Sequence, residues 1–137
     1  MTRVTPSFRL MLAGFCWAFA AGNSHAMDIE GAWASDVSQC HTVFSKRRES
    51  IVFSNVADAH GGGFIIEGDR IRGRVARCRV KSRTNGDATI HLIASCADDI
   101  LLSDVQMSLK VIDQNKIARI FPGVGDIEVS YERCTFD

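Results

Sequence analysis

The chain has 137 residues and carries 16 basic and 16 acidic side chains, so its formal net charge at neutral pH is zero. This length suits one domain, and the balanced charge argues against a nucleic-acid-binding protein, in which basic residues dominate. The longest apolar run, residues 10–21, is shorter than the roughly 20 residues that a membrane-spanning helix needs.

The first 26 residues have the three-part plan of a secretory signal peptide. Arg3 and Arg9 supply positive charge, the apolar run follows, and Ser24-His25-Ala26 places small residues at the −3 and −1 positions of a cleavage site. We expect cleavage after Ala26, export to the periplasm or the medium, and no membrane span after processing. Removing Arg3 and Arg9 from the 16 basic residues leaves 14 against 16 acidic ones, so the product, residues 27–137, is one domain with a net charge of about −2.

The exported part shows short apolar or alternating runs between turn signals, the pattern of β-strands. One short helix is expected after the first strand, capped by Ser35 or Asp36, with Lys46-Arg47-Arg48 at its C-terminal end. With no crossover helices, the pattern predicts an all-β, antiparallel up-and-down meander, closed into a small barrel or folded as a sandwich. The predicted strands are residues 29–35, 50–54, 63–67, 70–83, 88–96, 102–113, 116–121 and 126–134.

Two hairpins have turn residues that fix a register. Gly68-Asp69 is a two-residue turn with glycine first, and Gln114-Asn115 is the turn between two later strands. In both hairpins the expected cross-strand pairs keep one face apolar. The expected pairs are Glu67 with Arg70, Ile66 with Ile71, Asp113 with Lys116, Val111 with Ala118 and Leu109 with Ile120.

Four cysteines, Cys40, Cys78, Cys96 and Cys134, remain after signal-peptide cleavage. An even number in a small exported chain predicts two disulfides, and the absence of C-x-x-C spacing argues against a zinc site. Strand counting places Cys40 and Cys96 at one barrel end and Cys78 and Cys134 nearer the other, which favours pairing 40–96 with 78–134. The runner-up joins Cys78 to Cys96 within one hairpin and Cys40 to Cys134.

The most unusual stretch is residues 70–83, with seven cations and no acid. A β-bulge near Val75-Ala76 would bring all seven to one outer face and turn Cys78 inward. Such a face could bind anionic envelope polymers; alternatively it is a solvated strand whose cations pair with neighbouring acids such as Glu67. It lacks the interleaved aromatics of nucleic-acid-binding sheets, so no nucleic acid is expected. The seven cations are Arg70, Arg72, Arg74, Arg77, Arg79, Lys81 and Arg83.

The run His60-Gly61-Gly62-Gly63 is like the HGGG segment that forms part of an esterase oxyanion hole. An esterase also needs a G-x-S-x-G nucleophile elbow, and the chain has none. We therefore interpret the glycines as a loop end entering a strand where backbones approach closely. No catalytic residue, metal-ligand spacing or cofactor motif can be named, so neither an enzyme nor a cofactor is predicted.

Gly31-Ala32-Trp33, in the first predicted strand, resembles the G-x-W of lipocalins, avidins and related calycin barrels. The resemblance implies that Trp33 plugs one barrel end and packs under a basic residue near the last strand, a role that Arg133 would fill. Small exported bacterial barrels that inhibit proteases or lysozymes are similar in size, in the early G-x-W and in a cysteine shortly after it, here Cys40.

These features predict an exported binding module of unknown ligand that catalyses nothing. Its ligand would sit in a barrel mouth or on the arginine-rich face. The alternative is an inhibitor of a secreted protease or lysozyme, working through a loop such as residues 55–63. A third interpretation is a structural envelope protein without a ligand.

Overall fold

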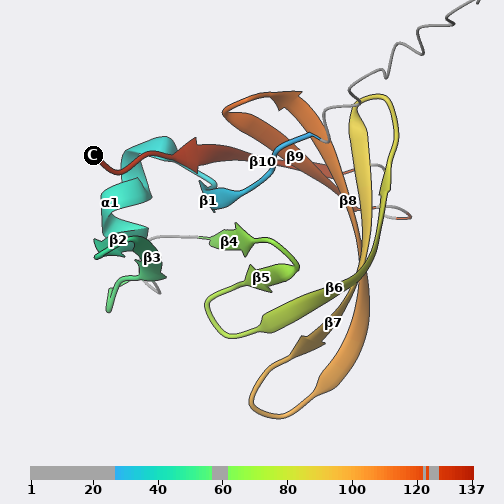
Figure 1. Ribbon diagram of the computed structural model, residues 1–137, viewed down its shortest axis with the longest axis horizontal. Coiled ribbons are helices and arrows are strands. Elements are labelled where there is room, and N and C mark those ends of the chain that lie inside the picture. The colour runs from blue at the N-terminus through green and yellow to red at the C-terminus, as the bar shows by residue number, and fades with distance from the viewer. Residues whose placement is uncertain (1–26, 57–61, 122, 124–126) are drawn as a thin grey trace, which may run out of the picture.

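The computed structural model describes residues 27–56, 62–121, 123 and 127–137; the predicted signal peptide, its cleavage site and His60-Gly61 lie outside them. Eight strands form a closed antiparallel barrel in the order β1-β10-β9-β8-β7-β6-β5-β4, which confirms the predicted all-β barrel (Figure 1). The barrel strands are β1 (Gly31–Ala34), β4 (Gly63–Glu67), β5 (Arg70–Arg72), β6 (Arg77–Asn85), β7 (Thr89–Ala97), β8 (Leu102–Asp113), β9 (Lys116–Phe121) and β10 (Ile127–Cys134).

A small lobe lies beside the barrel, between β1 and β4 in the chain (Figure 1). It consists of the 3-10 turn η1 (Val37–Gln39), the helix α1 (Cys40–Val43) and a hairpin of β2 (Phe44–Arg47) and β3 (Ser50–Phe53). The short helix after strand one is therefore confirmed. Asp36 caps η1, because its carboxylate accepts hydrogen bonds from the Ser38 hydroxyl (2.7 Å) and amide (2.9 Å), and these bonds lower the pKa of Asp36.

The basic segment Lys46-Arg47-Arg48 does not end the helix as predicted. Lys46 and Arg47 belong to β2, and Arg48 lies in the turn to β3 with a positive φ of 58°. The helix ends earlier, at Val43, because Phe44 is already extended and pairs with Phe53. The β-propensity of this aromatic pair outweighs the favourable placement of cations at a helix end.

The lobe and the barrel share a second apolar core outside the barrel. Ala32, Ala34 and Ile65 point outward from β1 and β4, and they are buried against Val43 and Phe44 of the lobe. Strand β1 is therefore covered on both faces, since Trp33 between the two alanines belongs to the inner core. A strand buried on both faces reads as a continuous apolar run rather than an alternating one.

The predicted number of barrel strands is right, but the predictions for two segments, residues 50–54 and residues 70–83, are wrong. Residues 50–53 pair with β2 in the lobe and not with the barrel. The long basic strand predicted over residues 70–83 is two strands, β5 and β6, which form a hairpin. The predicted bulge near Val75-Ala76 is a chain reversal, closed by a hydrogen bond from the Gly73 amide to the Ala76 carbonyl (2.8 Å).

The hairpin registers are confirmed at the turns and differ further along one strand pair. Glu67 pairs with Arg70 and Ile66 with Ile71, as predicted. Asp113 also pairs with Lys116, but a bulge at Ile112 shifts the rest of the β8–β9 ladder by one residue. The predicted pairs of Val111 with Ala118 and Leu109 with Ile120 are therefore wrong. The actual pairs are Val111 with Ile117, Lys110 with Ala118, Leu109 with Arg119 and Ser108 with Ile120.

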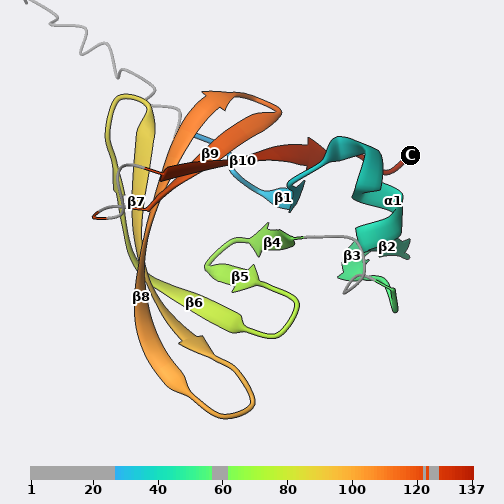
Figure 2. The ribbon, with the colours of Figure 1, turned by 180° about the vertical axis from the view of Figure 1, so that it is seen from behind.

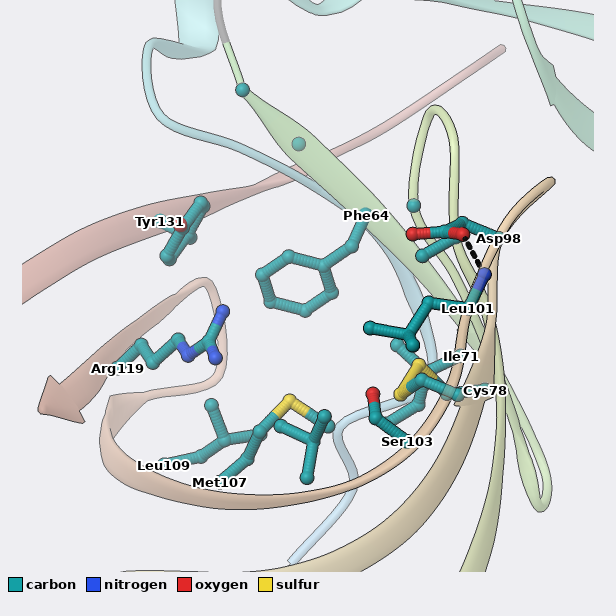
Figure 3. Close-up of a pocket in the computed structure, with 16 residues that line it drawn as sticks. Phe64, Ile71, Cys78, Asp98, Leu101, Ser103, Met107, Leu109, Arg119 and Tyr131 are labelled. Carbon is teal, nitrogen blue, oxygen red and sulfur yellow. Dashed lines mark hydrogen bonds between the residues drawn. A yellow bond between two sulfur atoms is a disulfide. The ribbon is translucent and has the colours of Figure 1, made fainter.

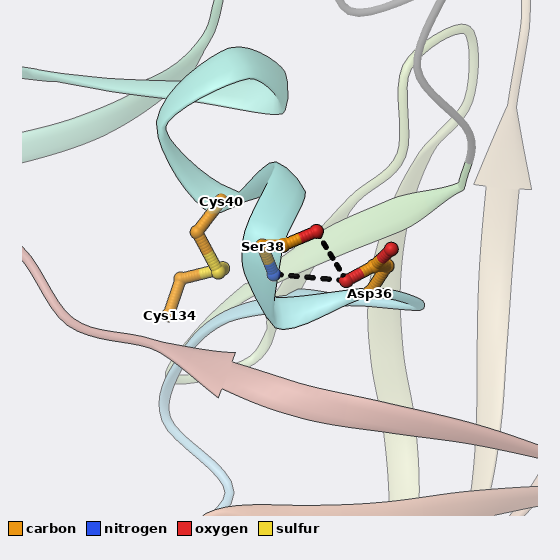
Figure 4. Close-up of a disulfide and its surroundings, with 4 residues drawn as sticks. All are labelled: Asp36, Ser38, Cys40 and Cys134. Carbon is orange, nitrogen blue, oxygen red and sulfur yellow. Dashed lines mark hydrogen bonds between the residues drawn. A yellow bond between two sulfur atoms is a disulfide. The ribbon is translucent and has the colours of Figure 1, made fainter.

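The disulfides are Cys40–Cys134 and Cys78–Cys96, which is the runner-up pairing; the favoured pairing is wrong. Cys78 and Cys96 lie directly opposite each other on β6 and β7. Cys40–Cys134 ties α1 to the end of β10, next to the Asp36 cap (Figure 4). Strand counting failed because it placed Cys78 in the middle of one long strand, whereas the reversal between β5 and β6 puts Cys78 near the start of β6, opposite Cys96 at the end of β7. It also left out the lobe, which packs Cys40 against the outer face of β1, where Cys134 pairs with Ala32.

Gly63 begins β4 at a close approach of three elements, as the interpretation of the glycine run expected. A Cβ atom at this position would lie 2.7 Å from the Trp33 carbonyl oxygen and 2.8 Å from Phe44 Cζ. Because one of these atoms is backbone, the strands would have to separate. We expect Gly63→Ala to lower the free energy of unfolding by about 1–3 kcal/mol, measured by denaturant titration.

Gly62 supplies the matched control for this substitution. It is the preceding residue, and a Cβ atom there would have no neighbour within 4 Å. Gly62→Ala should change the free energy of unfolding by no more than about 0.5 kcal/mol. Equal effects of the two alanines would contradict the close approach at Gly63.

Candidate functional site

The barrel interior holds a pocket of about 400 Å³ (Figure 3). Its rim belongs to the connections at one barrel end: Gly62 before β4, Gly73 and Ala76 between β5 and β6, and Asp98 and Leu101 between β7 and β8. The volume lies near the lower limit for small-molecule sites and suits a ligand with a compact apolar body. The apolar walls include Phe64, Ile71, Val105, Met107, Leu109 and Tyr131.

The opposite end of the barrel is closed by Trp33 and Arg133, in the arrangement that the G-x-W resemblance implies. Trp33 is fully buried and donates its indole N–H to the Ile29 carbonyl (2.9 Å). The Arg133 guanidinium lies 4.5 Å from the centroid of the Trp33 ring. Arg133 also donates to the carbonyls of Gln114 (2.8 Å), Asp28 (3.0 Å) and Glu30, so it links the chain before β1 to the β8–β9 turn.

Arg119 on β9 is a cation among the apolar walls of the pocket, and Figure 3 shows its side chain directed toward Phe64. The residue is half-buried, and its guanidinium lies 4.5 Å from the centroid of the Phe121 ring. None of the ion pairs among the described residues involves Arg119. A guanidinium that is partly removed from water and has no carboxylate partner among the described residues would be stabilised by an anion entering the pocket.

The inward direction of Arg119 does not follow from the sequence pattern, because the β8–β9 ladder contains a bulge at Ile112. Without the bulge, Leu109 would face Ile120, and Arg119 would point to the outer surface. A slip of one residue exchanges the two faces of a strand. The available signal is that β9 has apolar residues at positions of both parities, Ile117 and Phe121 on the side of Arg119 and Ile120 on the other.

The arginine-rich segment does not form one continuous stripe. Four of its cations point outward on β5 and β6, where each arginine of one strand lies directly opposite an arginine of the other. Cys78, between two of them, faces the pocket as predicted. Lys81 sits at a bulge, after which Arg83 pairs with the inward Leu92 and donates to the Met27 carbonyl (2.6 Å). The outward pairs are Arg70 with Arg79 and Arg72 with Arg77, and Arg74 lies in the connecting turn.

Acids on adjacent strands and turns pair with several of these cations. Glu67 lies 2.9 Å from Arg72, and Asp69 lies 3.4 Å from Arg79. Asp104 lies 3.0 Å from Lys81, whose hydrogen bond lowers the pKa of Asp104. Exposed pairs of this kind contribute little to stability, about 0–1 kcal/mol each. These contacts support the interpretation of the segment as a solvated wall, with Glu67 as one of the expected partners.

The described histidines and acids form no group of three that could hold a metal ion. His41 packs edge-on against Phe136, with ring centroids 5.5 Å apart. His91 is exposed on β7, and its Nδ1 lies 2.9 Å from the Ser108 hydroxyl. Within the described residues, the helical segments are too short and too polar to cross a membrane.

Three features of the described residues therefore define the candidate site: an apolar pocket open at one barrel end, Arg119 inside it, and a closed end formed by Trp33 and Arg133. This arrangement can bind a small molecule, and nothing in it provides a nucleophile paired with a base. Comparison of the chain with family models, with curated proteins and with solved structures gave no match.

Proposed function

We propose that this protein is an exported binding protein that holds a small amphiphilic anion in the open end of its barrel. The observation that carries the proposal is Arg119, a half-buried guanidinium without a carboxylate partner among the described residues, in an otherwise apolar pocket. An acidic head group would pair with Arg119, and an apolar body would contact Phe64, Met107 and Leu109.

The polar groups of the pocket are few and distinct in their roles. Ser103 supplies a hydroxyl to the wall, and the Tyr131 ring packs edge-on against Phe64 with centroids 4.8 Å apart. Asp98 lies at the rim, and its carboxylate accepts hydrogen bonds from the amides of Ile100 (2.8 Å) and Leu101 (2.7 Å). These bonds lower the pKa of Asp98, so it remains ionised and selects against anions that stop at the rim.

The proposal that the protein is exported rests on two features. One is the predicted signal peptide, and the other is the pair of disulfides, since disulfides persist in oxidising compartments. Binding by the outward arginines and inhibition of a secreted hydrolase remain predictions. The loop expected to inhibit such a hydrolase, residues 55–63, lies partly outside the described residues. The interior pocket is favoured over the arginine face because Glu67, Asp69 and Asp104 already pair with three of the outer cations.

Substituting Arg119 tests the proposal. Linear alkyl carboxylates and the alcohols of the same chain length should bind the wild-type protein with a preference for the acids, measured by calorimetry. Arg119→Met keeps much of the side-chain volume and removes the charge. We expect it to weaken carboxylate binding about 10- to 150-fold, the effect of losing a hydrogen bond to a charged group, and to leave alcohol binding nearly unchanged.

Lys116→Met provides the matched control, because Lys116 is a cation on the same strand, at the closed end of the barrel. It should leave carboxylate binding as in the wild type. An equal preference for acids and alcohols in both the wild type and Arg119→Met would remove Arg119 from the site. If the wild type binds neither series, the pocket is not a site for small amphiphiles.

A further inference from the structure

Two adjacent turns at the open end of the barrel expose large apolar side chains. Ile100, Leu101 and Leu102 follow one another at the β7–β8 connection and are 96%, 62% and 72% exposed. Val75, in the β5–β6 turn, is 77% exposed. In Figures 1 and 2 the β7–β8 turn lies at the bottom of the molecule and the β5–β6 turn lies above it, and both are away from the β6–β7 turn at the top. We call these four residues the apolar tip.

Hydrogen bonds define the backbone that presents the apolar tip. The Asp98 carboxylate accepts the amides of Ile100 and Leu101, and the Asp98 amide donates to the Leu101 carbonyl (3.1 Å). In the neighbouring turn, Gly73 donates to the Ala76 carbonyl. The apolar side chains are therefore exposed on turns whose backbones are held in place by hydrogen bonds. Exposed apolar clusters of this kind mark contact surfaces in soluble proteins.

The apolar tip borders both the pocket and a polar hollow. Leu101 is also a rim residue of the interior pocket, so the tip and the pocket mouth form one face. On its outer side, a second hollow of about 590 Å³ is lined by the cations Arg72, Arg74 and Arg77 and by Asp98 and Asp99. Arginines beside projecting apolar side chains match the lipid-phosphate layer above the acyl chains of a membrane.

We propose that the open end of the barrel docks on a phospholipid bilayer, with the apolar tip inserted among the lipids and the adjacent arginines at the head groups. Four side chains on two projecting turns offer too little area for a stable dimer, which needs about 800 Å² on each partner. A bilayer surface deforms around such projections, and binding then scales with the apolar area inserted. The proposal does not depend on ligand binding, although it would bring the pocket mouth to the membrane.

The acids near the tip set the expected lipid dependence. Asp98 and Asp99 share the hollow with the three arginines, and Glu67 pairs with Arg72. Attraction to anionic lipid is therefore the smaller contribution, and insertion of the apolar side chains is the larger one. We expect binding to phosphatidylcholine vesicles, and binding that is stronger by less than about tenfold when phosphatidylglycerol is included.

Flotation of the disulfide-bonded mature protein with these vesicles tests the proposal. The double variant Ile100→Ser/Leu102→Ser removes the two most exposed side chains of the β7–β8 turn and leaves Leu101 at the pocket. Its partition into either vesicle should fall about tenfold or more. Arg77→Gln should lose no more than about fivefold, and only when phosphatidylglycerol is present. Unchanged thermal unfolding of both variants would show that they remain folded.

Ile112→Ser is the matched control, since Ile112 is 49% exposed and lies at the closed end of the barrel. It should partition like the wild type. Absence of vesicle binding by the wild type, or an equal loss in Ile112→Ser, would overturn the proposal. So would a wild-type dimer in sedimentation that the tip variant converts to a monomer without any vesicle binding, because the tip would then join two copies.

Discussion

Replacing Cys40 and Cys134 with alanine should lower the free energy of unfolding by about 4.7 kcal/mol. The bond joins residues 94 positions apart, so it restricts most of residues 27–137 in the unfolded state. Domains of this size are stable by only about 5–15 kcal/mol. Both cysteines are buried, so alanine avoids leaving a buried hydroxyl without a partner. Denaturant titration followed by Trp33 fluorescence measures the loss.

The second disulfide provides the comparison. Cys78–Cys96 closes a separation of only 18 residues, within one hairpin that the β6–β7 ladder already holds together. Its replacement by alanines should cost about 3.2 kcal/mol on the same chain-entropy argument. The order of the two losses is the test. If removal of Cys78–Cys96 costs more, restriction of the unfolded chain is not the main source of stability.

Trp33→Ala should cost about 3–5 kcal/mol, because it leaves a cavity where a fully buried indole closes the barrel. It also removes the hydrogen bond to Ile29 and leaves the Arg133 guanidinium without its aromatic partner. Trp33→Phe keeps much of the ring and should cost less, about 1–2 kcal/mol. Both losses follow from denaturant titration with a circular dichroism signal, since the fluorophore is removed.

The contribution of the Arg133–Trp33 contact can be isolated with a double-mutant cycle. Trp33→Ala and Arg133→Met should be coupled by about 0.5–2 kcal/mol, the range for a cation over an aromatic ring. Phe136→Ala serves as the control, because Phe136 is a half-buried aromatic residue outside the barrel. It should cost about 1–2 kcal/mol and show no coupling to Arg133. A loss below about 1 kcal/mol for Trp33→Ala would mean that the barrel is not closed by this ring.

The parts of the fold that the sequence predicts well are those specified by residues close together in the chain. The Gly68-Asp69 turn sets the β4–β5 register, because glycine at the first position accepts the positive φ of 59° observed there. The number of disulfides and the inward position of Cys78 follow from composition and alternation in the same way. These features need no knowledge of distant partners.

The parts that it predicts poorly depend on contacts between distant segments. Residues 50–53 have the pattern of a barrel strand, but they cover the outer faces of β1 and β4 instead. Regular alternation of arginines across Gly73 concealed a chain reversal. The favoured disulfide pairing inherited the second error, because it placed Cys78 in the middle of one long strand and not at the start of β6. For the candidate site, the open barrel mouth was anticipated, whereas Arg119 was not, because its direction depends on one extra residue in a neighbouring strand.

The bulge at Ile112 also has a consequence for how such a protein could diverge. It lies in the hairpin at the closed end of the barrel, yet it decides whether Arg119 or Ile120 faces the pocket at the other end. A hairpin of regular register would carry Arg119 to the outer surface, opposite Lys110, and leave an apolar pocket. Among descendants of this chain, loss of this single bulge would therefore remove the cation from the pocket as fully as a substitution of Arg119 itself, without replacing any residue of the pocket wall.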